Sequence, residues 1–231
     1  MAEIETRMVE FPANGRHMPG YLARPAEQGA PGVIVIQEWW GLVPHIKDVA
    51  ERFAREGFVA LAPDLYYGKA AEEPDDARKL AMEMDRPRAV RDLEGAATYL
   101  RSLGCEKVGA VGYCMGGALV WELATRPGVI DAGAPYYGRP VAMERIDEVN
   151  VPIEAFYGEK DHSIAHESVR QVADALKQQG KDVDVHIYEG AEHAFFNDSR
   201  PGAYHRDASE DAWRRTLAFF RRTLGETPAT V

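Results

Sequence analysis

Cysteine is scarce in this sequence, and its scarcity excludes two kinds of small scaffold. The 231 residues contain two cysteines, Cys105 and Cys114, which are too few for a disulfide framework or a four-cysteine zinc site. Either both thiols are packed in a core or one of them is reactive. A chain of this length needs no such staples, because one core can bury roughly three quarters of the unfolded surface.

Positive charge and long apolar runs are also in short supply. Lys and Arg number 27 against 37 Asp and Glu, a net charge of −10, and the basic residues are interleaved with acids. Nucleic-acid binding needs clustered Lys and Arg, so we expect no nucleic-acid partner. The apolar runs are far shorter than the roughly 20 residues of a membrane span, and the acidic N-terminus lacks a signal-peptide core. We therefore expect a soluble, cytoplasmic protein with no membrane partner.

Motifs for phosphate, dinucleotide and metal binding are missing as well. Neither G-x-x-x-x-G-K-[ST] nor G-x-G-x-x-G occurs in the sequence. His162 and His166 form an H-x-x-x-H pair, but the glutamate of H-E-x-x-H and a third ligand are lacking. We expect neither a metal site nor a cofactor.

Short β-branched runs alternate with amphipathic segments along most of the chain. A hairpin is predicted over residues 4–24, with Asn14-Gly15 in its turn. Strands are predicted over residues 32–36, 58–62, 107–111, 130–137, 151–157 and 183–188, and helices over 44–56, 73–84, 88–103, 115–125, 165–179 and 204–224. This order predicts an α/β fold with a mostly parallel sheet, an antiparallel N-terminal hairpin and helices on both faces. No long linker or repeat divides residues 1–231, which we expect to form a single domain.

One glycine-rich segment lies between a predicted strand and an apolar helix. It reads Gly112-Tyr113-Cys114-Met115-Gly116-Gly117, which is the nucleophile elbow G-x-S-x-G with Cys in the Ser position. At a helix N-terminus the dipole favours a thiolate, and the N–H of Met115 points to where an oxyanion would form. Cys114 is therefore the candidate nucleophile, although many free cysteines are only small buried hydrophobes. Cys105 lacks this context and is expected to pack in the core.

A nucleophile of this kind needs a base and a carboxylate that orients the base. Asp161 follows the strand over 151–157 and stands 47 residues after Cys114, and His193 follows the next strand, 32 residues later. The order nucleophile, acid, histidine is that of α/β-hydrolases. Glu159 and Glu192 are competing acids.

The second oxyanion donor should come from the loop after the strand over 32–36. The N–H of Trp39 is the candidate, although Trp39 and Trp40 can also simply wall the core.

Five motifs occur in a fixed order over nearly the whole chain. They are Gln37-Glu38-Trp39-Trp40-Gly41, Ala62-Pro63-Asp64-Leu65-Tyr66, Gly112 to Gly117, Gly158-x-x-Asp161-His162 and Gly190-x-x-His193-x-Phe195. Together they resemble the dienelactone hydrolase, or carboxymethylenebutenolidase, family of the α/β-hydrolase superfamily. The resemblance implies an α/β-hydrolase fold and a triad of Cys114, His193 and Asp161. It also implies that Glu38 gates the nucleophile: the resting thiol is hydrogen-bonded to this glutamate, and an anionic substrate displaces the carboxylate toward the thiol, which gives up its proton.

The sequence departs from the best-known members of that family where they bind the substrate carboxylate. Those members carry one arginine shortly after the catalytic histidine and another in the helix before the elbow. Asn197 takes the place of the first, and Arg78 lies in the region of the second. The candidate substrate-binding residues are therefore Arg78, Tyr137, Phe195 and Asn197. Other arginines, such as Arg139 or Arg200, could replace the missing one.

The leading hypothesis is a cysteine-dependent hydrolase that opens a small lactone or enol ester through a thioester acyl-enzyme. A broader carboxylesterase or thioesterase on the same triad is the alternative favoured by the missing arginine. A thiol sensor or binding protein with a hydrolase fold is the non-enzyme alternative, and the presence of a whole triad argues against it. We expect the partner to be a small, anionic ester or lactone, and the protein to be a monomer or small homo-oligomer.

Overall fold

One eight-stranded sheet runs through the part of the chain that the computed structural model describes, residues 3–26 and 29–225. Its order is β1-β2-β4-β3-β5-β6-β7-β8. The strands are β1 (Ile4–Ala13), β2 (Arg16–Pro25), β3 (Gly32–Ile36), β4 (Val59–Pro63), β5 (Val108–Tyr113), β6 (Ala132–Tyr136), β7 (Ile153–Gly158) and β8 (Val183–Tyr188). β2 pairs antiparallel with β1 and β4, and the pairs from β4 to β8 are parallel. The predicted sheet is thereby confirmed.

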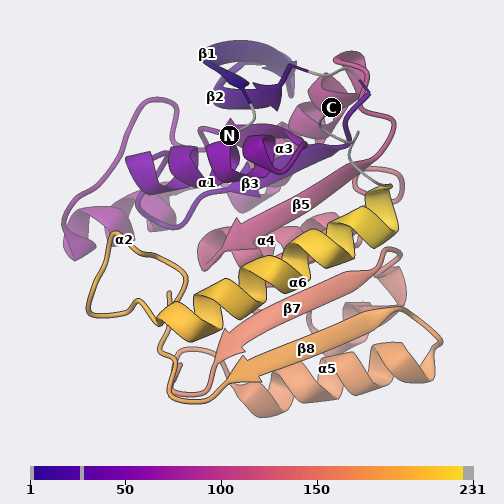
Figure 1. Ribbon diagram of the computed structural model, residues 1–231. Coiled ribbons are helices and arrows are strands. Elements are labelled where there is room, and N and C mark those ends of the chain that lie inside the picture. Colours follow the sequence, from indigo (N-terminus) through magenta and orange to yellow (C-terminus); the bar gives the residue numbers. More distant parts are fainter. Residues whose placement is uncertain (1–2, 27–28, 226–231) are drawn as a thin grey trace.

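The N-terminal hairpin closes through a two-residue turn. Asn14 and Gly15 have φ values of 48° and 74°, and Ala13 pairs directly with Arg16 across the turn. Positive φ at both central residues is the geometry for which Asn-Gly is favoured. The hairpin lies at one edge of the sheet, at the top of the view in Figure 1.

Helices cover both faces of the sheet because successive strand residues point to opposite sides. Val33 and Val35 of β3 pack with α1 (Pro44–Arg55) and α6 (Arg206–Leu224), whereas Ile34 and Ile36 pack with α3 (Arg86–Ser102) and α4 (Met115–Leu123). α5 (His166–Gln178) packs against β8. In Figure 1, α6 crosses the sheet in front of β5 and β7.

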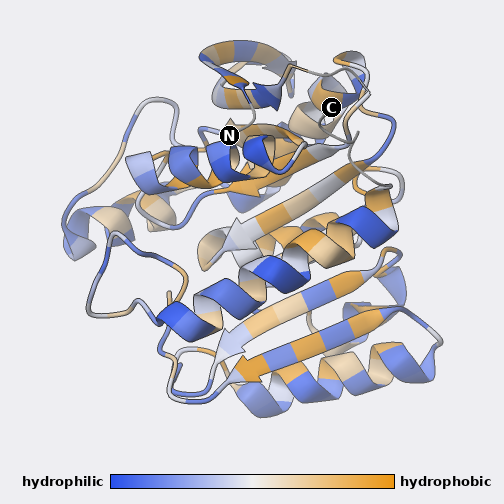
Figure 2. Cartoon of the chain, viewed as in Figure 1, coloured by the Kyte–Doolittle hydropathy of each residue, from blue (hydrophilic) through white to orange (hydrophobic). Residues whose placement is uncertain are grey.

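Hydrophilic residues lie on the outer sides of these helices. In Figure 2, hydrophobic residues run along much of β5, while α1 and α6 present many hydrophilic residues to the viewer. Among the helices of residues 3–26 and 29–225, none combines the length and the apolar character that a membrane crossing requires.

One helix begins earlier than expected, and one short turn of helix was not expected. α3 begins at Arg86 rather than residue 88, because the Asp85 side chain accepts the N–H of Arg88 (3.1 Å) and caps the first turn. α2 (Pro74–Glu83) matches the expected acidic helix closely. A short 3-10 helix, η1 (Met143–Glu148), was missed, since its six residues carry too little periodicity to detect.

Candidate functional site

The sharp turn between β5 and α4 holds Cys114 in a backbone conformation that few residues adopt. Its φ and ψ are 55° and −111°. A Cβ on Gly112 would lie 2.2 Å from the carbonyl oxygen of Gly116, and one on Gly116 would lie 2.4 Å from that of Ile36. Only glycine allows this approach, so the motif's spacing follows from the geometry of the turn. The turn leaves Cys114 half-buried at the N-terminus of α4.

A histidine and a carboxylate from two later loops meet beside this turn. His193 Nδ1 lies 2.6 Å from Asp161 Oδ2, and the Asp161 side chain is fully buried. Burial alone would raise the pKa of Asp161, but hydrogen bonds from His193 and Ser163 hold it below its usual value. Burial lowers the pKa of His193, and its interactions with Asp161 and Cys114 outweigh this and raise it to about 10. The pair therefore favours an imidazolium beside the thiol.

Ser163 is a contributor to this pair that the sequence reasoning missed. Its N–H (2.9 Å) and its hydroxyl (2.6 Å) both donate to Asp161 Oδ1, and its Oγ lies 3.2 Å from His193 Nδ1. These bonds occupy one carboxylate oxygen and leave the other for the imidazole. The spacing Asp-x-Ser, typical of a turn in which a side chain bonds the backbone two residues on, is the signal that could have identified it.

The competing acids make other contacts. Glu159 accepts the backbone N–H of Gly190 (2.9 Å) and so links the two loops that carry Asp161 and His193. Glu192 is exposed and lies in the wall of the cavity described below. Neither carboxylate has the contact with His193 that Asp161 makes.

The two candidate oxyanion donors, the N–H groups of Trp39 and Met115, belong to residues that line the cavity together with Cys114. Met115 is the first residue of α4, so its N–H has no partner within the helix. The carbonyl of Glu38 accepts the N–H of Gly41 (3.4 Å). The peptide bond between Glu38 and Trp39 is trans, so the N–H of Trp39 points away from that carbonyl oxygen. Trp39, Met115 and Cys114 line the same cavity, as an oxyanion hole requires.

Glu38 is hydrogen-bonded to Asn197. The Asn197 side-chain N–H donates to Glu38 Oε2 (2.7 Å), and both residues are about 1% exposed. The N–H and hydroxyl of Ser199 donate to Asn197 Oδ1, which turns the amide nitrogen toward Glu38. Burial raises the pKa of Glu38, partly offset by the Asn197 hydrogen bond and by the charges of His193 and Arg200. Among the described residues, the structure gives the Glu38 side chain this bond and none to Cys114, unlike the resting contact that the family resemblance implies.

A cavity of about 800 Å³ opens over these groups. Its floor contains Cys114, His193 and Asp161. Its walls are largely apolar, and its cationic lining residues are Arg86, Arg139, Lys160 and Arg200. The guanidinium carbon of Arg200 lies 3.3 Å from the ring centroid of Trp40, so the indole face supports this cation.

Of the four residues expected to bind substrate, the structure brings one, Tyr137, into the cavity wall. Asn197 is buried against Glu38, and Phe195 is fully buried in the core. Arg78 is 64% exposed on α2, where it pairs with Asp75 (3.6 Å). The structure therefore does not bring these three side chains into the lining of the cavity, because Phe195 and Asn197 are buried and Arg78 pairs with Asp75 on α2.

The second thiol lies where the sequence analysis expected it, in the core. Cys105 is 2% exposed, and burial raises its pKa to about 11, as for a packing thiol. Within residues 3–26 and 29–225, no three His, Cys, Asp or Glu side chains gather in a group that could hold a metal ion.

Comparison with known proteins places the chain among ester hydrolases. The model of the dienelactone hydrolase family matches residues 18–224. "Protein usf" of Aquifex pyrophilus is 41% identical, with 94% of this chain and 99% of the relative covered, and a candidate carboxymethylenebutenolidase of Aquifex aeolicus (strain VF5) is 36% identical with the same coverage.

Solved structures agree with these relatives. A candidate dienelactone hydrolase from Klebsiella pneumoniae superposes with a TM-score of 0.87 at 29% identity, covering 95% of this chain and 99% of the other. A dienelactone hydrolase-like promiscuous phosphotriesterase from metagenomic libraries gives 0.86 at 25% identity, covering 97% and 100%. With a family match over nearly the whole chain and the α/β-hydrolase fold in place, the chain belongs to the dienelactone hydrolase family and is a hydrolase that acts on ester bonds.

Proposed function

We propose that this hydrolase opens a small ester or lactone through a thioester formed on Cys114. The observation that carries the proposal is the meeting of three groups in one cavity: a thiol on a strained elbow, the hydrogen-bonded pair of His193 and Asp161, and two backbone donors. A nucleophile, an oriented base and an oxyanion hole are the parts that acyl transfer needs.

In the acylation step, the sulfur of Cys114 attacks the carbonyl carbon of the substrate. The thiol proton is held by His193 as the sulfur attacks, since the raised pKa of His193 favours its imidazolium form. Negative charge develops on the carbonyl oxygen and is stabilised by the N–H groups of Trp39 and Met115. When the carbonyl re-forms, the bond to the leaving oxygen breaks, His193 gives its proton to that oxygen and a thioester remains. An enolate or phenolate leaves readily because it is a weak base.

Water completes the cycle in the second step. His193 takes a proton from water, and the resulting hydroxide attacks the thioester carbon through the same oxyanion hole. The carbon–sulfur bond breaks, the carboxylic acid is released and the thiol is restored. Asp161 holds the imidazole in its orientation throughout, since its own second oxygen is tied to Ser163.

Glu38 has a gating role in this proposal. Glu38 lines the cavity with Cys114, and in the free protein its carboxyl group accepts a hydrogen bond from Asn197 rather than from the thiol. An anion entering the cavity would raise the pKa of Glu38 further by repulsion and favour its acid form. Asn197 keeps this bond in either protonation state, since an amide N–H donates to an acid as well as to a carboxylate.

The proposed substrate carries a negative charge. Of the carboxyl groups lining the cavity, Asp161 is paired with His193, burial favours the neutral form of Glu38, and Glu192 is exposed to solvent. Cationic side chains line the same cavity, and among them Arg200 is half-buried and supported by the ring of Trp40. Arg200 is therefore our candidate for the carboxylate contact that Asn197 does not make.

A broader carboxylesterase is the second candidate, because the walls of the cavity are mainly apolar and Asn197 offers no charge to a substrate. Matched neutral and anionic p-nitrophenyl esters separate the two candidates. We expect the wild-type enzyme to prefer the anionic ester, and Arg200→Gln to lose that preference while Arg206→Gln, an exposed control on α6, keeps it. Equal kcat/KM for both esters in the wild type would exclude the anionic substrate.

Cys114→Ala tests the nucleophile itself. Removing one triad member should lower kcat/KM by on the order of 10³-fold or more. The variant should fold normally, because Ala is smaller than Cys at a half-buried position. Turnover within a few-fold of the wild type would refute the proposal.

A further inference from the structure

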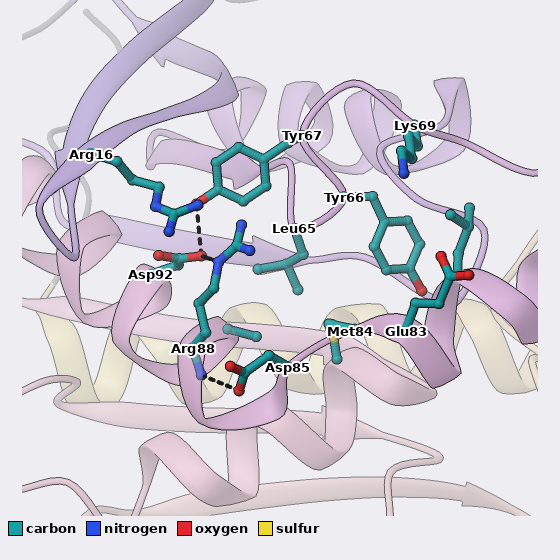
Figure 3. A pocket seen from close by; sticks show the side chains of 12 residues that line it. Arg16, Leu65, Tyr66, Tyr67, Lys69, Glu83, Met84, Asp85, Arg88 and Asp92 are labelled. Atoms are coloured by element: carbon teal, nitrogen blue, oxygen red, sulfur yellow. Dashed lines mark hydrogen bonds and ion pairs between the residues drawn. The ribbon is translucent and has the colours of Figure 1, made fainter.

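A second cavity, of about 420 Å³, lies beside the active site and has the ring of Tyr66 in its wall (Figure 3). Tyr66 follows β4 in a turn that Asp64 organises by accepting the N–H groups of Tyr66 (3.1 Å) and Gly68 (2.7 Å). The preceding residue is fixed too, since the N–H of Leu65 donates to the side chain of Gln37 (3.1 Å). Tyr66 is therefore a buried side chain on a firmly held loop.

The hydroxyl of Tyr66 reaches toward the active site. It lies 3.1 Å from the carbonyl oxygen of Trp39, to which it donates, and 3.5 Å from the sulfur of Met115. Trp39 and Met115 are the two residues whose N–H groups form the proposed oxyanion hole. They come from separate segments, the loop after β3 and the start of α4, so one side chain touches both halves of the hole.

The hydroxyl keeps its proton under working conditions. Burial, and in addition the charge of Cys114, raise the pKa of Tyr66 well above its ordinary value. A neutral phenol can donate to the Trp39 carbonyl at any pH at which the enzyme works.

The spacing of the two donors decides how well the hole works. Donors must lie within about 2.7 to 3.1 Å of the oxyanion, and a catalytic group has a tolerance of about 0.5 Å. The loop that carries Trp39 is closed by the long Gly41 to Glu38 hydrogen bond of 3.4 Å, and the carbonyl of Trp40 accepts the N–H of Ala71 (2.9 Å), but neither bond links the loop to α4. A fixed contact from outside this loop would restrict its movement relative to α4.

We propose that Tyr66 is a positioning residue of the oxyanion hole, which holds the Trp39 loop in register with the first turn of α4. The proposal rests on the proposed function, in which these two N–H groups stabilise the oxyanion. Tyr66 makes no bond to the substrate, and its effect passes through Trp39 and Met115.

Tyr66→Phe removes the hydroxyl and keeps the ring. The neighbouring Tyr67→Phe is a matched control, because Tyr67 lines the same second cavity and loses a hydroxyl bond to Asp92 (2.8 Å) that leads away from the active site (Figure 3). Stopped-flow release of p-nitrophenol from p-nitrophenyl acetate measures acylation, which passes through an oxyanion. Alkylation of Cys114 by iodoacetamide depends on the thiolate but forms no oxyanion.

Removing a direct oxyanion donor costs about 10²- to 10³-fold, so we expect a smaller loss, about 5- to 50-fold in the acylation rate and in kcat, for Tyr66→Phe. KM, the alkylation rate and the melting temperature should match those of Tyr67→Phe, in which acylation stays near the wild-type rate. Acylation within twofold of the wild type would overturn the proposal. So would equal losses in acylation and alkylation, because they would mean a displaced thiol or a loosened fold.

The two proposals fail in different ways. If Cys114 is not the nucleophile, Cys114→Ala retains the release of p-nitrophenol and the wild type forms no acyl-enzyme on that residue. If only the role of Tyr66 is wrong, the wild type acylates Cys114 and Tyr66→Phe does so equally fast.

Discussion

Replacing Asn197 with leucine removes the donor that the buried carboxyl group of Glu38 uses. The Asn197 N–H lies 2.7 Å from Glu38 Oε2, and the Glu38 side chain is buried. A hydrogen bond to a charged group contributes about 1.5 to 3 kcal/mol to the free energy of unfolding. For a chain of this size 1 kcal/mol corresponds to about 2 to 4 °C in melting temperature, so Asn197→Leu should lose about 3 to 12 °C when Glu38 is ionised.

The pH dependence of this loss is the sharper part of the prediction. Burial raises the pKa of Glu38 and the Asn197 bond lowers it, so removing Asn197 raises the pKa further. A carboxyl group whose pKa is raised by folding lowers stability as pH rises through that pKa, because the unfolded chain ionises more readily. The loss caused by Asn197→Leu should therefore be small at pH 4, where Glu38 is neutral in both states, and larger at pH 8.

The measurement is urea unfolding of wild type and variant at both pH values. Ser199→Ala is a control for the exposed end of the network, since Ser199 donates to Asn197 Oδ1 and should matter little at either pH. In the background of Glu38→Gln the cost of Asn197→Leu should lose its pH dependence, because no charge remains to be stabilised. Equal losses at pH 4 and pH 8 in the wild-type background would refute the reasoning.

Three further results are expected. Gly116→Ala should lower the yield of soluble protein and its melting temperature severely and abolish esterase activity, because the added Cβ would lie 2.4 Å from the carbonyl oxygen of Ile36. A wild-type melting curve would contradict the elbow geometry. The stability that His193 contributes should be complete below about pH 6.5 and lost as pH rises through about 10, since burial lowers its pKa but Asp161 and the neighbouring thiol raise it. A difference in the free energy of unfolding between wild type and His193→Gln that stays constant from pH 6 to 10 would contradict this prediction. Ser163→Ala should raise the pKa of Asp161 and move the acid limb of kcat/KM to higher pH, and an unmoved limb would mean that the Ser163 hydroxyl does not tune this carboxylate.

The fold was accessible from the sequence because local signals agreed with one another. Val33 and Val35 alternate with Ile34 and Ile36 and are buried on opposite faces, so a fully apolar run followed by an amphipathic helix predicts a central strand. Asn14-Gly15 fixed the position of the hairpin turn. Helix ends were less accurate, because a cap such as Asp85 acts through one side-chain hydrogen bond rather than through periodicity.

The site was only partly accessible. Cys114, Asp161 and His193 each follow a strand, and the carboxyl ends of parallel strands meet at one edge, so topology alone brought them together. Asn197 was expected to face the substrate because of its place in the chain, but two donors from Ser199 turn its amide toward Glu38. Such an orientation depends on side-chain hydrogen bonds within a loop, which no sequence pattern specifies.

The cationic lining was also only partly accessible: the sequence offered Arg139 and Arg200 as replacements for the missing arginine but could not place them. Arg139 and Arg200 belong to loops 61 residues apart, and only the folded chain brings both to one cavity. Arg78, by contrast, stands in a helix whose exposed face it shares with Asp75. The spacing of residues in a helix indicates which of them share a face, but it does not show whether that face borders the cavity.

Mass spectrometry of the enzyme caught during turnover tests the central claim most directly. The protein is mixed with p-nitrophenyl acetate, quenched in acid within the first turnover and digested, and the acetylated peptide is sequenced. The account predicts one acetyl group on the peptide that carries Cys114, removable by hydroxylamine as a thioester should be, and no acetylated peptide in Cys114→Ala. An acetyl group on another residue, or turnover without any acylated Cys114, would contradict it.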